Sequence, residues 1–292
     1  MRFGVVLLLP HPVADEVDGL RRACGDPALD QIAPHITLAP PVNVGDSDIP
    51  QGLAVLRRAA AWGGPLDLRL GPVTTFPTEE HVAYLAVDGG GDDPEGQCQT
   101  LEELRAAVFV PPFERDLDHD FVPHVTVSQG LDTERLVNVL AATAGYRDRP
   151  VRFDALYLLE QRHGPAGRRW VAVADVALGA PVIVGRGGLP TELTSGELVD
   201  PEAAAWLADQ RASGAADKSD SGSEAEPDLD PVGSRPLVTV ARREGAVVGV
   251  GQGWTAGPAA DLVELTVGDP NDGTNDHLAA AWWSAAASRR AG

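Results

Sequence analysis

The sequence predicts an α+β fold for the N-terminal part of the chain, followed by a smaller α/β domain. Strand-like and helix-like segments alternate through the first 180 residues, with about seven strands. Residues 212–230 are rich in Ser, Gly, Asp and Glu and lack apolar periodicity, which returns at residue 237. We therefore expect domains at 1–180 and 237–292. The segment 181–236 should supply a hinge, a short helix and an acidic disordered linker.

Each element of the first domain follows from a local pattern. Alternating or continuous apolar runs predict strands, and apolar residues three and four positions apart predict helices. The strands are expected at residues 2–9, 35–44, 66–76, 81–87, 121–128, 151–159 and 170–178, and the helices at 13–24, 51–62, 94–109 and 132–144. Gly25 follows the first helix as a stop signal, Pro94 opens the third, and Asp132 is a plausible N-cap of the fourth.

The rest of the chain has a different texture. Residues 185–188 are a glycine-rich hinge, and residues 200–210 have the pattern of a short helix. Strands are expected at 237–242, 246–251 and 262–267, before an Ala/Trp-rich helix at 275–289. These elements predict the second, smaller α/β domain.

Composition excludes several classes of protein. The 43 acidic residues against 23 basic ones give a net charge of −20, which disfavours broad binding of duplex nucleic acid. The opening apolar run is too short for a secretory signal, and no other run approaches the roughly 18 residues of a membrane span. Two cysteines without a Cys/His cluster indicate neither a disulfide framework nor a zinc site. We expect a cytoplasmic protein without a membrane segment, metal or cofactor.

An internal repeat is the most informative feature of the sequence. Residues 34–38 read Pro-His-Ile-Thr-Leu, and residues 123–127 read Pro-His-Val-Thr-Val, so His35 and His124 lie 89 positions apart. Either histidine alone is more often a hydrogen-bonded structural residue than a catalyst. The repetition of the whole pattern with identical spacing favours the paired catalytic interpretation.

The spacing within each copy also carries information. Successive side chains of a strand alternate between its faces, so each histidine shares one face with the threonine two residues later. His35 and Thr37 would therefore face a cleft together, as would His124 and Thr126. If the two halves are related by a pseudo-two-fold axis, both pairs reach a shared groove.

Two facing histidines suit acid–base catalysis. Histidine titrates near neutrality, so one ring can accept a proton while its partner donates one. The threonine hydroxyls can donate hydrogen bonds to the two free oxygens of a phosphodiester. No carboxylate cluster accompanies the histidines, which disfavours a metal-dependent hydrolase. The pattern indicates a metal-free phosphodiesterase centre.

The paired His-x-Thr-x motifs resemble those of the two-histidine phosphoesterase superfamily, in the group of RNA 2′,3′-cyclic phosphodiesterases and 2′-5′ RNA ligases. The resemblance covers residues 1–180 and implies a bilobal fold with two antiparallel sheets around a central cleft. It also implies hydrolysis of 2′,3′-cyclic phosphates, with reversible 2′-5′ joining in some members. By motif position, His35 would be the general acid and His124 the general base, with Thr37 and Thr126 binding phosphate.

The sequence departs from that family after the second motif. Many relatives have a basic residue there, where this chain has Ser128 and Gln129. Gln129 could still bind substrate through a hydrogen bond. The missing charge favours a small nucleotide or a short RNA end as substrate, and it makes ligation doubtful.

Other side chains could contribute to the site. Arg162 is the preferred source of phosphate-binding charge, although an arginine near a strand end is usually solvated, and His119 could reach the cleft. Further arginines of the same kind are Arg115, Arg168 and Arg169. Tyr157 and Trp170 could stack on a base or pack in the core.

The C-terminal segment from residue 237 is similar to the second half of a Gcn5-related N-acetyltransferase. In that family a loop at a helix N-terminus holds the coenzyme A pyrophosphate. Here the loop carries Asp269, Asp272 and Asp276, which would repel a pyrophosphate. We interpret the domain as degenerate, with a role in packing, regulation or homodimer formation.

Three functions remain as hypotheses from the sequence. The leading one is an enzyme that hydrolyses cyclic phosphate or 2′-5′ phosphodiester bonds of nucleotides or short RNA ends. The second is a regulatory protein that binds a nucleotide without turnover. The third is acyl transfer by the C-terminal domain.

Overall fold

The computed structural model describes residues 1–76, 81–165, 167–185, 190–213, 234–269 and 272–291. The chain forms two compact units, residues 1–172 and 173–292. The division falls within strand β8 (Gly167–Ala177), eight residues before the boundary expected from the sequence. Among the described helices, none is long and apolar enough to cross a membrane.

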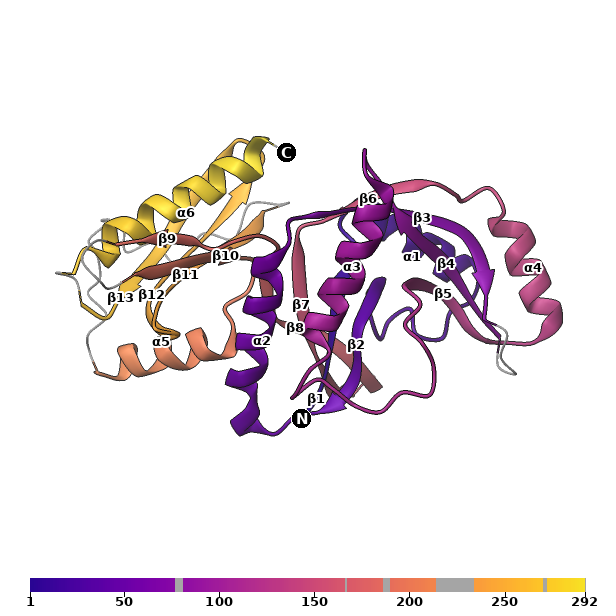
Figure 1. The fold of residues 1–292 in the computed structure, drawn as a ribbon, viewed down its shortest axis with the longest axis horizontal. Coiled ribbons are helices and arrows are strands. Elements are labelled where there is room, and N and C mark those ends of the chain that lie inside the picture. Colours follow the sequence, from indigo (N-terminus) through magenta and orange to yellow (C-terminus); the bar gives the residue numbers. More distant parts are fainter. Residues whose placement is uncertain (77–80, 166, 186–189, 214–233, 270–271, 292) are drawn as a thin grey trace. The chain divides into compact units, whose positions relative to one another are not determined.

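The first unit alternates strands and helices (Figure 1). Its helices are α1 (Val13–Ala23), the short 3-10 helix η1 (Asp46–Asp48), α2 (Ile49–Trp62), α3 (Pro94–Val108) and α4 (Thr133–Thr143). Its strands besides β8 are β1 (Arg2–Leu8), β2 (His35–Asn43), β3 (Leu66–Thr75), β4 (His81–Gly89), β5 (His124–Leu131), β6 (Arg149–Phe153) and β7 (Ala155–Gly164).

Two four-stranded sheets organise the described part of this unit. One has the strand order β2-β1-β7-β8, and we call it the His35 sheet; the other has the order β5-β4-β3-β6, and we call it the His124 sheet. β2 and β5 are the edge strands of their sheets, and each pairs antiparallel with the strand that precedes it in its strand-helix-strand unit, β1-α1-β2 or β4-α3-β5. The two sheets therefore repeat one arrangement, as the internal sequence repeat predicts.

Apolar alternation anchors the two motif strands. Ile36 and Leu38 of β2 are fully buried, as are Val125 and Val127 of β5. The intervening histidines and threonines are only partly buried. Each strand thus fixes one face in the apolar core and leaves the other for chemistry.

Most predicted elements of this unit are confirmed, including the Asp132 cap, whose carboxylate accepts a hydrogen bond from the Arg135 amide at 2.8 Å. The expected strand at 151–159 is instead two strands separated at Asp154. β6 pairs with β3 in the His124 sheet, whereas β7 pairs with β1 in the His35 sheet. The chain leaves one sheet and enters the other at this residue, which an unbroken apolar pattern does not reveal.

The second unit contains one antiparallel sheet in its described residues, with the strand order β13-β12-β11-β10-β9. Its strands are β9 (Val182–Val184), β10 (Thr191–Gly196), β11 (Arg235–Arg243), β12 (Ala246–Ala256) and β13 (Ala259–Val267). Its helices are α5 (Pro201–Ser213) and α6 (Thr274–Ala291).

The two helices cover opposite faces of this sheet, as Figure 1 shows. Leu207 of α5 packs against Val238 and Val240 of β11. Trp282 of α6 packs against Leu237, the neighbouring residue on β11, and its indole N–H donates to the Leu237 carbonyl at 2.9 Å. Because adjacent strand residues face opposite sides, α5 and α6 bury the two faces of the sheet separately.

The segment 181–236 contains the predicted short helix, as α5, and also two strands that the sequence did not predict. It contributes β9, β10 and α5 to the second unit. The sequence did not predict β10, because Leu193 is its one apolar side chain. It did not predict β9 either, because that strand has only three residues. The predicted disordered stretch 212–230 lies outside the described residues from 214 onward, and so does all but Gly185 of the predicted hinge.

Candidate active site

His35 begins β2 and belongs to the first copy of the repeat. Its Nδ1 lies 2.7 Å from the carbonyl oxygen of Ala33. Because a carbonyl oxygen only accepts hydrogen bonds, Nδ1 carries the proton and Nε2 of the neutral ring keeps its lone pair. The Nε2 atom has no hydrogen-bond partner within the described chain, so it is available to a ligand.

His124 begins β5 and is held in the same way. Its Nδ1 lies 2.7 Å from the carbonyl oxygen of Val122, again two residues before the histidine. The ring is partly buried and packs edge-on against two aromatic rings, those of Phe76 and Tyr84. Both copies of the repeat therefore orient an imidazole by one backbone hydrogen bond and leave its Nε2 for chemistry.

Both imidazoles favour the neutral form. The strands β2 and β5 contact each other. Burial lowers the pKa of His35 to about 4; the hydrogen bond to its backbone carbonyl raises the pKa, and the charges of Arg21 and His124 lower it. Burial also lowers the pKa of His124, its backbone hydrogen bond raises the pKa, and His119 lowers it. A bound anion would be needed to hold a proton on either ring at neutral pH.

The two threonines lie beside the histidines as predicted from strand alternation. Thr37 is opposite Val6 in the β1/β2 pair, and Thr126 is opposite Tyr84 in the β4/β5 pair. Both side chains are partly buried. Neither hydroxyl bonds to another group in the described part of the chain, so both can donate to an anionic oxygen.

The repeat extends to the irregularities of the two strands. In both β2 and β5, a step of two residues from the threonine along the motif strand corresponds to a step of only one residue along the neighbouring strand. A step of five residues corresponds to a step of three. Each motif strand therefore contains two β-bulges at equivalent places. The first bulge turns Ala39 or Ser128 toward the core, where both are fully buried. In β5 it brings Gln129 to the cleft side, the reverse of regular alternation.

Gln129 lines a groove of about 250 Å³ in the first unit. The other polar and aromatic residues that line the groove come from the His35 sheet and the loop before β2: Arg2, Gln31, Gln161, Arg168 and Trp170. The structure thus places Gln129, a sequence-predicted binding residue, where side chains from the two sheets meet.

Arg162, the other sequence-predicted binding residue, is not brought to this face. Its Nε donates to Glu160 at 2.8 Å. Glu160 pairs with the buried Phe3, whose side chain faces away from Val6 and Thr37. Alternation along β7 puts Arg162 on the same side as Glu160, so it points away from the histidines.

An aromatic pair beside His124 was missed by sequence reasoning. The rings of Phe76 and Tyr84 stack with centroids 4.1 Å apart, and their centroids lie 5.0 and 5.4 Å from that of His124. Tyr84 belongs to a strand that the sequence predicts, but its position opposite Thr126 depends on the strand register. The pair offers a flat apolar surface next to the catalytic candidate.

A metal site is not evident around these residues. No group of three or more His, Cys, Asp or Glu side chains is placed to hold a metal ion in the part of the chain that the structure describes. The chemical groups that the site does present are two imidazoles, two hydroxyls and a nearby aromatic surface.

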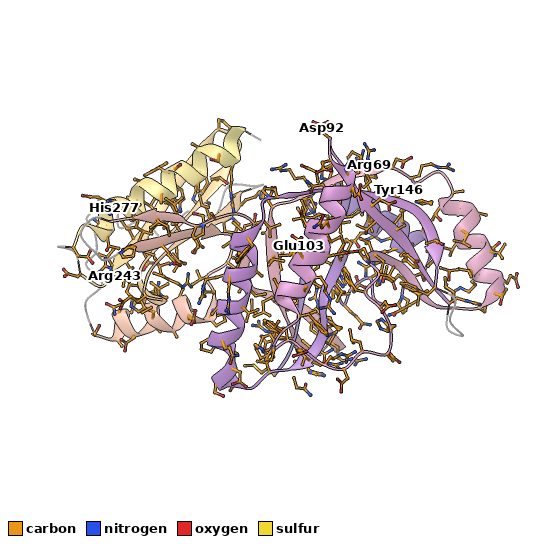
Figure 2. All side chains as sticks on the ribbon, in the orientation of Figure 1. Arg69, Asp92, Glu103, Tyr146, Arg243 and His277 are labelled. Carbon is orange, nitrogen blue, oxygen red and sulfur yellow. The ribbon has the colours of Figure 1, made fainter. Side chains whose placement is uncertain are left out.

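The loop before α6 can be compared with the expected pyrophosphate site. Asp272 accepts a hydrogen bond from the Thr274 amide at 2.8 Å and forms an ion pair with Arg243 at 3.0 Å. Figure 2 shows Arg243 and His277 at the end of the second unit where α6 begins. The Thr274 amide at the start of this helix is therefore already bonded to a carboxylate of the chain itself, in the loop where the resemblance to an N-acetyltransferase would place a pyrophosphate.

The first unit thus has the architecture and paired histidines of a two-histidine phosphoesterase. A family model described as "2'-5' RNA ligase superfamily" matches residues 9–165, more than half of the chain and both motifs. The chain belongs to this superfamily. The match ends before the second unit, whose likeness to an N-acetyltransferase remains a prediction.

Curated bacterial proteins similar to this chain have names consistent with this family. A Bacillus pumilus protein named "Putative phosphoesterase" is 29% identical over 164 residues, which cover 55% of this chain and 91% of that protein. A Bacillus cereus (strain B4264) protein with the same description is 30% identical over 164 residues, covering 55% and 90%.

Two solved structures are also similar to part of the chain. The protein TT0787 of Thermus thermophilus shares 19% sequence identity at a TM-score of 0.42, over 61% of this chain and 98% of that one. E. coli LigT complexed with 3'-AMP shares 16% identity at a TM-score of 0.40, over 61% and 97%.

Proposed function

We propose that the first unit is a metal-independent phosphodiesterase that hydrolyses 2′,3′-cyclic phosphate or 2′-5′ phosphodiester bonds of nucleotides or short RNA ends. The main support is the pair of matched imidazoles on contacting edge strands. Each ring donates from Nδ1 to a backbone carbonyl and leaves Nε2 available to a ligand. This arrangement supplies a proton acceptor and a proton donor to one phosphoryl group.

The reaction balances with two proton transfers. One neutral imidazole accepts a proton from water as the water oxygen bonds to phosphorus. The other imidazole, protonated while the anionic substrate is bound, donates its proton to the leaving 3′ oxygen as the P–O3′ bond breaks. The product is a 2′-phosphate. By the family resemblance His124 is the base and His35 the acid, and Thr37 and Thr126 donate to the free phosphate oxygens.

The aromatic pair supports a nucleotide as substrate. Phe76 and Tyr84 lie beside His124, where they can stack on the base of a bound nucleotide. The net charge of −20 supports a small substrate or a short RNA end over a long duplex.

A substrate panel tests this function. The purified protein is incubated with 2′,3′-cyclic mononucleotides, ADP-ribose 1″,2″-cyclic phosphate and 2′-5′-linked dinucleotides, with and without EDTA, and products are identified by phosphorus NMR. We expect 2′-phosphate products and full activity in EDTA. A strict metal requirement contradicts the mechanism, and tight binding without any product supports the regulatory alternative.

We propose that the second unit is a degenerate acyltransferase-like domain that does not bind coenzyme A and acts in packing, regulation or homodimer formation. Asp272 at the start of α6 supports this proposal, because its carboxylate would repel a pyrophosphate. A thermal shift of the protein with acetyl-CoA would contradict it.

A further inference from the structure

The groove beside Gln129 continues the surface that carries His35 and Thr37. The positions of Arg2, Gly4 and Val6 lie on one face of β1. Alternation is unbroken along β1, because the extra residue of each bulge belongs to β2. Val6 is opposite Thr37, so Arg2 lies on the same face as Thr37. Four residues of strand separate Arg2 from the Val6 row, which is about 13 Å. The groove is therefore too far from the histidines for its side chains to contact a phosphate bound between them.

The neighbouring strands extend the same face. Leu159 of β7 is opposite Gly4, so Gln161 two residues later also faces the groove, which it lines. A Cβ added to Gly4 would lie 3.9 Å from the Trp170 ring, which places that ring over Gly4. Arg168, two residues before Trp170 on β8, lines the groove as well.

The groove has an electrostatic character unlike that of the acidic chain around it. Neither Arg2 nor Arg168 forms an ion pair with any carboxylate that the structure describes, whereas Arg162 on the other face is paired with Glu160. A third arginine, Arg115, has its Nη1 3.5 Å from the carbonyl oxygen of Pro41 at the groove wall. Unpaired guanidinium groups beside glutamine amides are suited to a phosphate group.

One wall of the groove is the loop before β2, which contributes Ala28, Gln31 and Ile32. Buried interactions hold this loop in place. The ion pair between Arg21 and Asp26 has both side chains almost fully buried, at 3% and 1% exposure. Arg21 also donates to the carbonyl of Ala28, and the Gln31 carbonyl accepts a hydrogen bond from the Trp170 amide at 2.7 Å. The wall is therefore fixed before any ligand arrives, which lowers the entropic cost of binding.

We propose that this groove is a second subsite, which binds the phosphate and base of the nucleotide adjoining the reacting phosphate. The proposal rests on the proposed function and narrows its substrate class from nucleotides or short RNA ends to short RNA ends of two or more nucleotides. Arg2 and Arg168 bind the phosphate, Gln129 and Gln161 donate hydrogen bonds, and Trp170 stacks on the base.

The test compares two substrates that differ by one nucleotide: adenosine 2′,3′-cyclic phosphate, and adenylyl-adenosine ending in a 2′,3′-cyclic phosphate. We expect the wild-type kcat/KM to be about tenfold or more higher for the dinucleotide, the usual effect of a hydrogen bond to a charged group. Arg168→Gln and Arg2→Gln should each reduce this ratio by about tenfold.

Arg169→Gln is the matched control, because Arg169 is exposed and alternation puts it on the other face of β8. It should leave the ratio of the two kcat/KM values unchanged. A wild-type ratio near one, or equal losses in Arg168→Gln and Arg169→Gln, overturns the subsite.

A binding measurement separates failure of the subsite from failure of the proposed function. If the wild type hydrolyses neither substrate, the proposed function fails, and calorimetry with 3′-AMP and the 3′-phosphorylated dinucleotide still tests the groove. Tighter binding of the dinucleotide that is lost in Arg168→Gln supports the subsite. Equal affinity for the two ligands overturns it.

Discussion

The His35 sheet and the His124 sheet share a frame but differ in what surrounds the repeated residues. Both have an edge strand with a histidine held by a carbonyl two residues earlier, and both have two bulges at equivalent positions. At the position opposite the threonine, the His35 sheet has the buried Val6 and the His124 sheet has Tyr84. In the proposed mechanism the repeated part supplies the acid–base pair, and the part that differs supplies the proposed separate subsites.

The difference gives the site a direction. An aromatic surface of Phe76 and Tyr84 flanks His124, whereas the groove with Arg2 and Arg168 extends from the His35 sheet. A symmetric site would bind a substrate equally well in two orientations. The unequal surroundings provide a physical reason for one leaving oxygen to be chosen over the other.

Removal of either repeated histidine should have the largest effect. We expect His35→Ala and His124→Ala each to lower kcat by about 10² to 10⁴, the usual contribution of a positioned acid or base. The measurement is initial rates on a cyclic nucleotide, with circular dichroism to confirm folding. His277→Ala, an exposed histidine of the second unit, is the control and should leave the rate unchanged. Loss in only one of the two variants would contradict paired catalysis.

The aromatic surface should affect substrates that carry a base. Tyr84→Leu is expected to raise KM for a cyclic nucleotide about tenfold, because base–aromatic stacking contributes about 1–3 kcal/mol per base. Ribose 2′,3′-cyclic phosphate, which lacks the base, should retain its KM. An equal loss on both substrates would mean that Tyr84 acts by supporting the ring of His124 instead of binding the base.

The pH dependence should reflect the surroundings of both imidazoles. Because the pKa of His35 is lowered to about 4 and that of His124 is also lowered, the bell-shaped kcat/KM profile should lie on the acid side of 6.5. The pH values of its two limbs do not depend on which ring is the acid and which is the base. The kcat profile should be displaced to higher pH, since bound phosphate favours the protonated ring. A kcat/KM value that rises through pH 7 would contradict the burial of these rings.

The smallest effect concerns the first bulge. The Ser128 hydroxyl is fully buried and has no hydrogen-bond partner among the described residues, and the equivalent position in β2 is Ala39. Ser128→Ala should raise the free energy of unfolding by about 1 kcal/mol, and Ala39→Ser should lower it by a similar amount. Urea denaturation measures both. Destabilisation by Ser128→Ala would show that the hydroxyl has a stabilising partner.

Local patterns were sufficient to predict the motif strands and their neighbours. Alternation around His35 and His124 correctly put the adjacent apolar residues in the core. The pairing register could not be read in the same way, because it depends on contacts between distant segments. Tyr84 opposite Thr126, and the bulge that turns Gln129 into the cleft, are consequences of that register.

The same limit explains what the sequence did not predict elsewhere. At Asp154 the chain moves from one sheet to the other without a glycine or proline to mark the change. The strand β10 has little apolar character of its own and is specified by pairing with β11. The sequence favoured Arg162 over Arg168 as a binding residue, whereas Arg168 lines the groove and Arg162 lies on the other face.

Histidine ¹⁵N NMR during titration with 3′-AMP tests most directly whether both imidazoles bind one phosphoryl group. We expect the Nε2 resonances of His35 and His124 to shift together and to saturate at one equivalent of ligand. At least one of the two rings should become protonated at a pH where both are neutral in the free protein. Shifts confined to one histidine, or two separate saturations, would contradict the shared site.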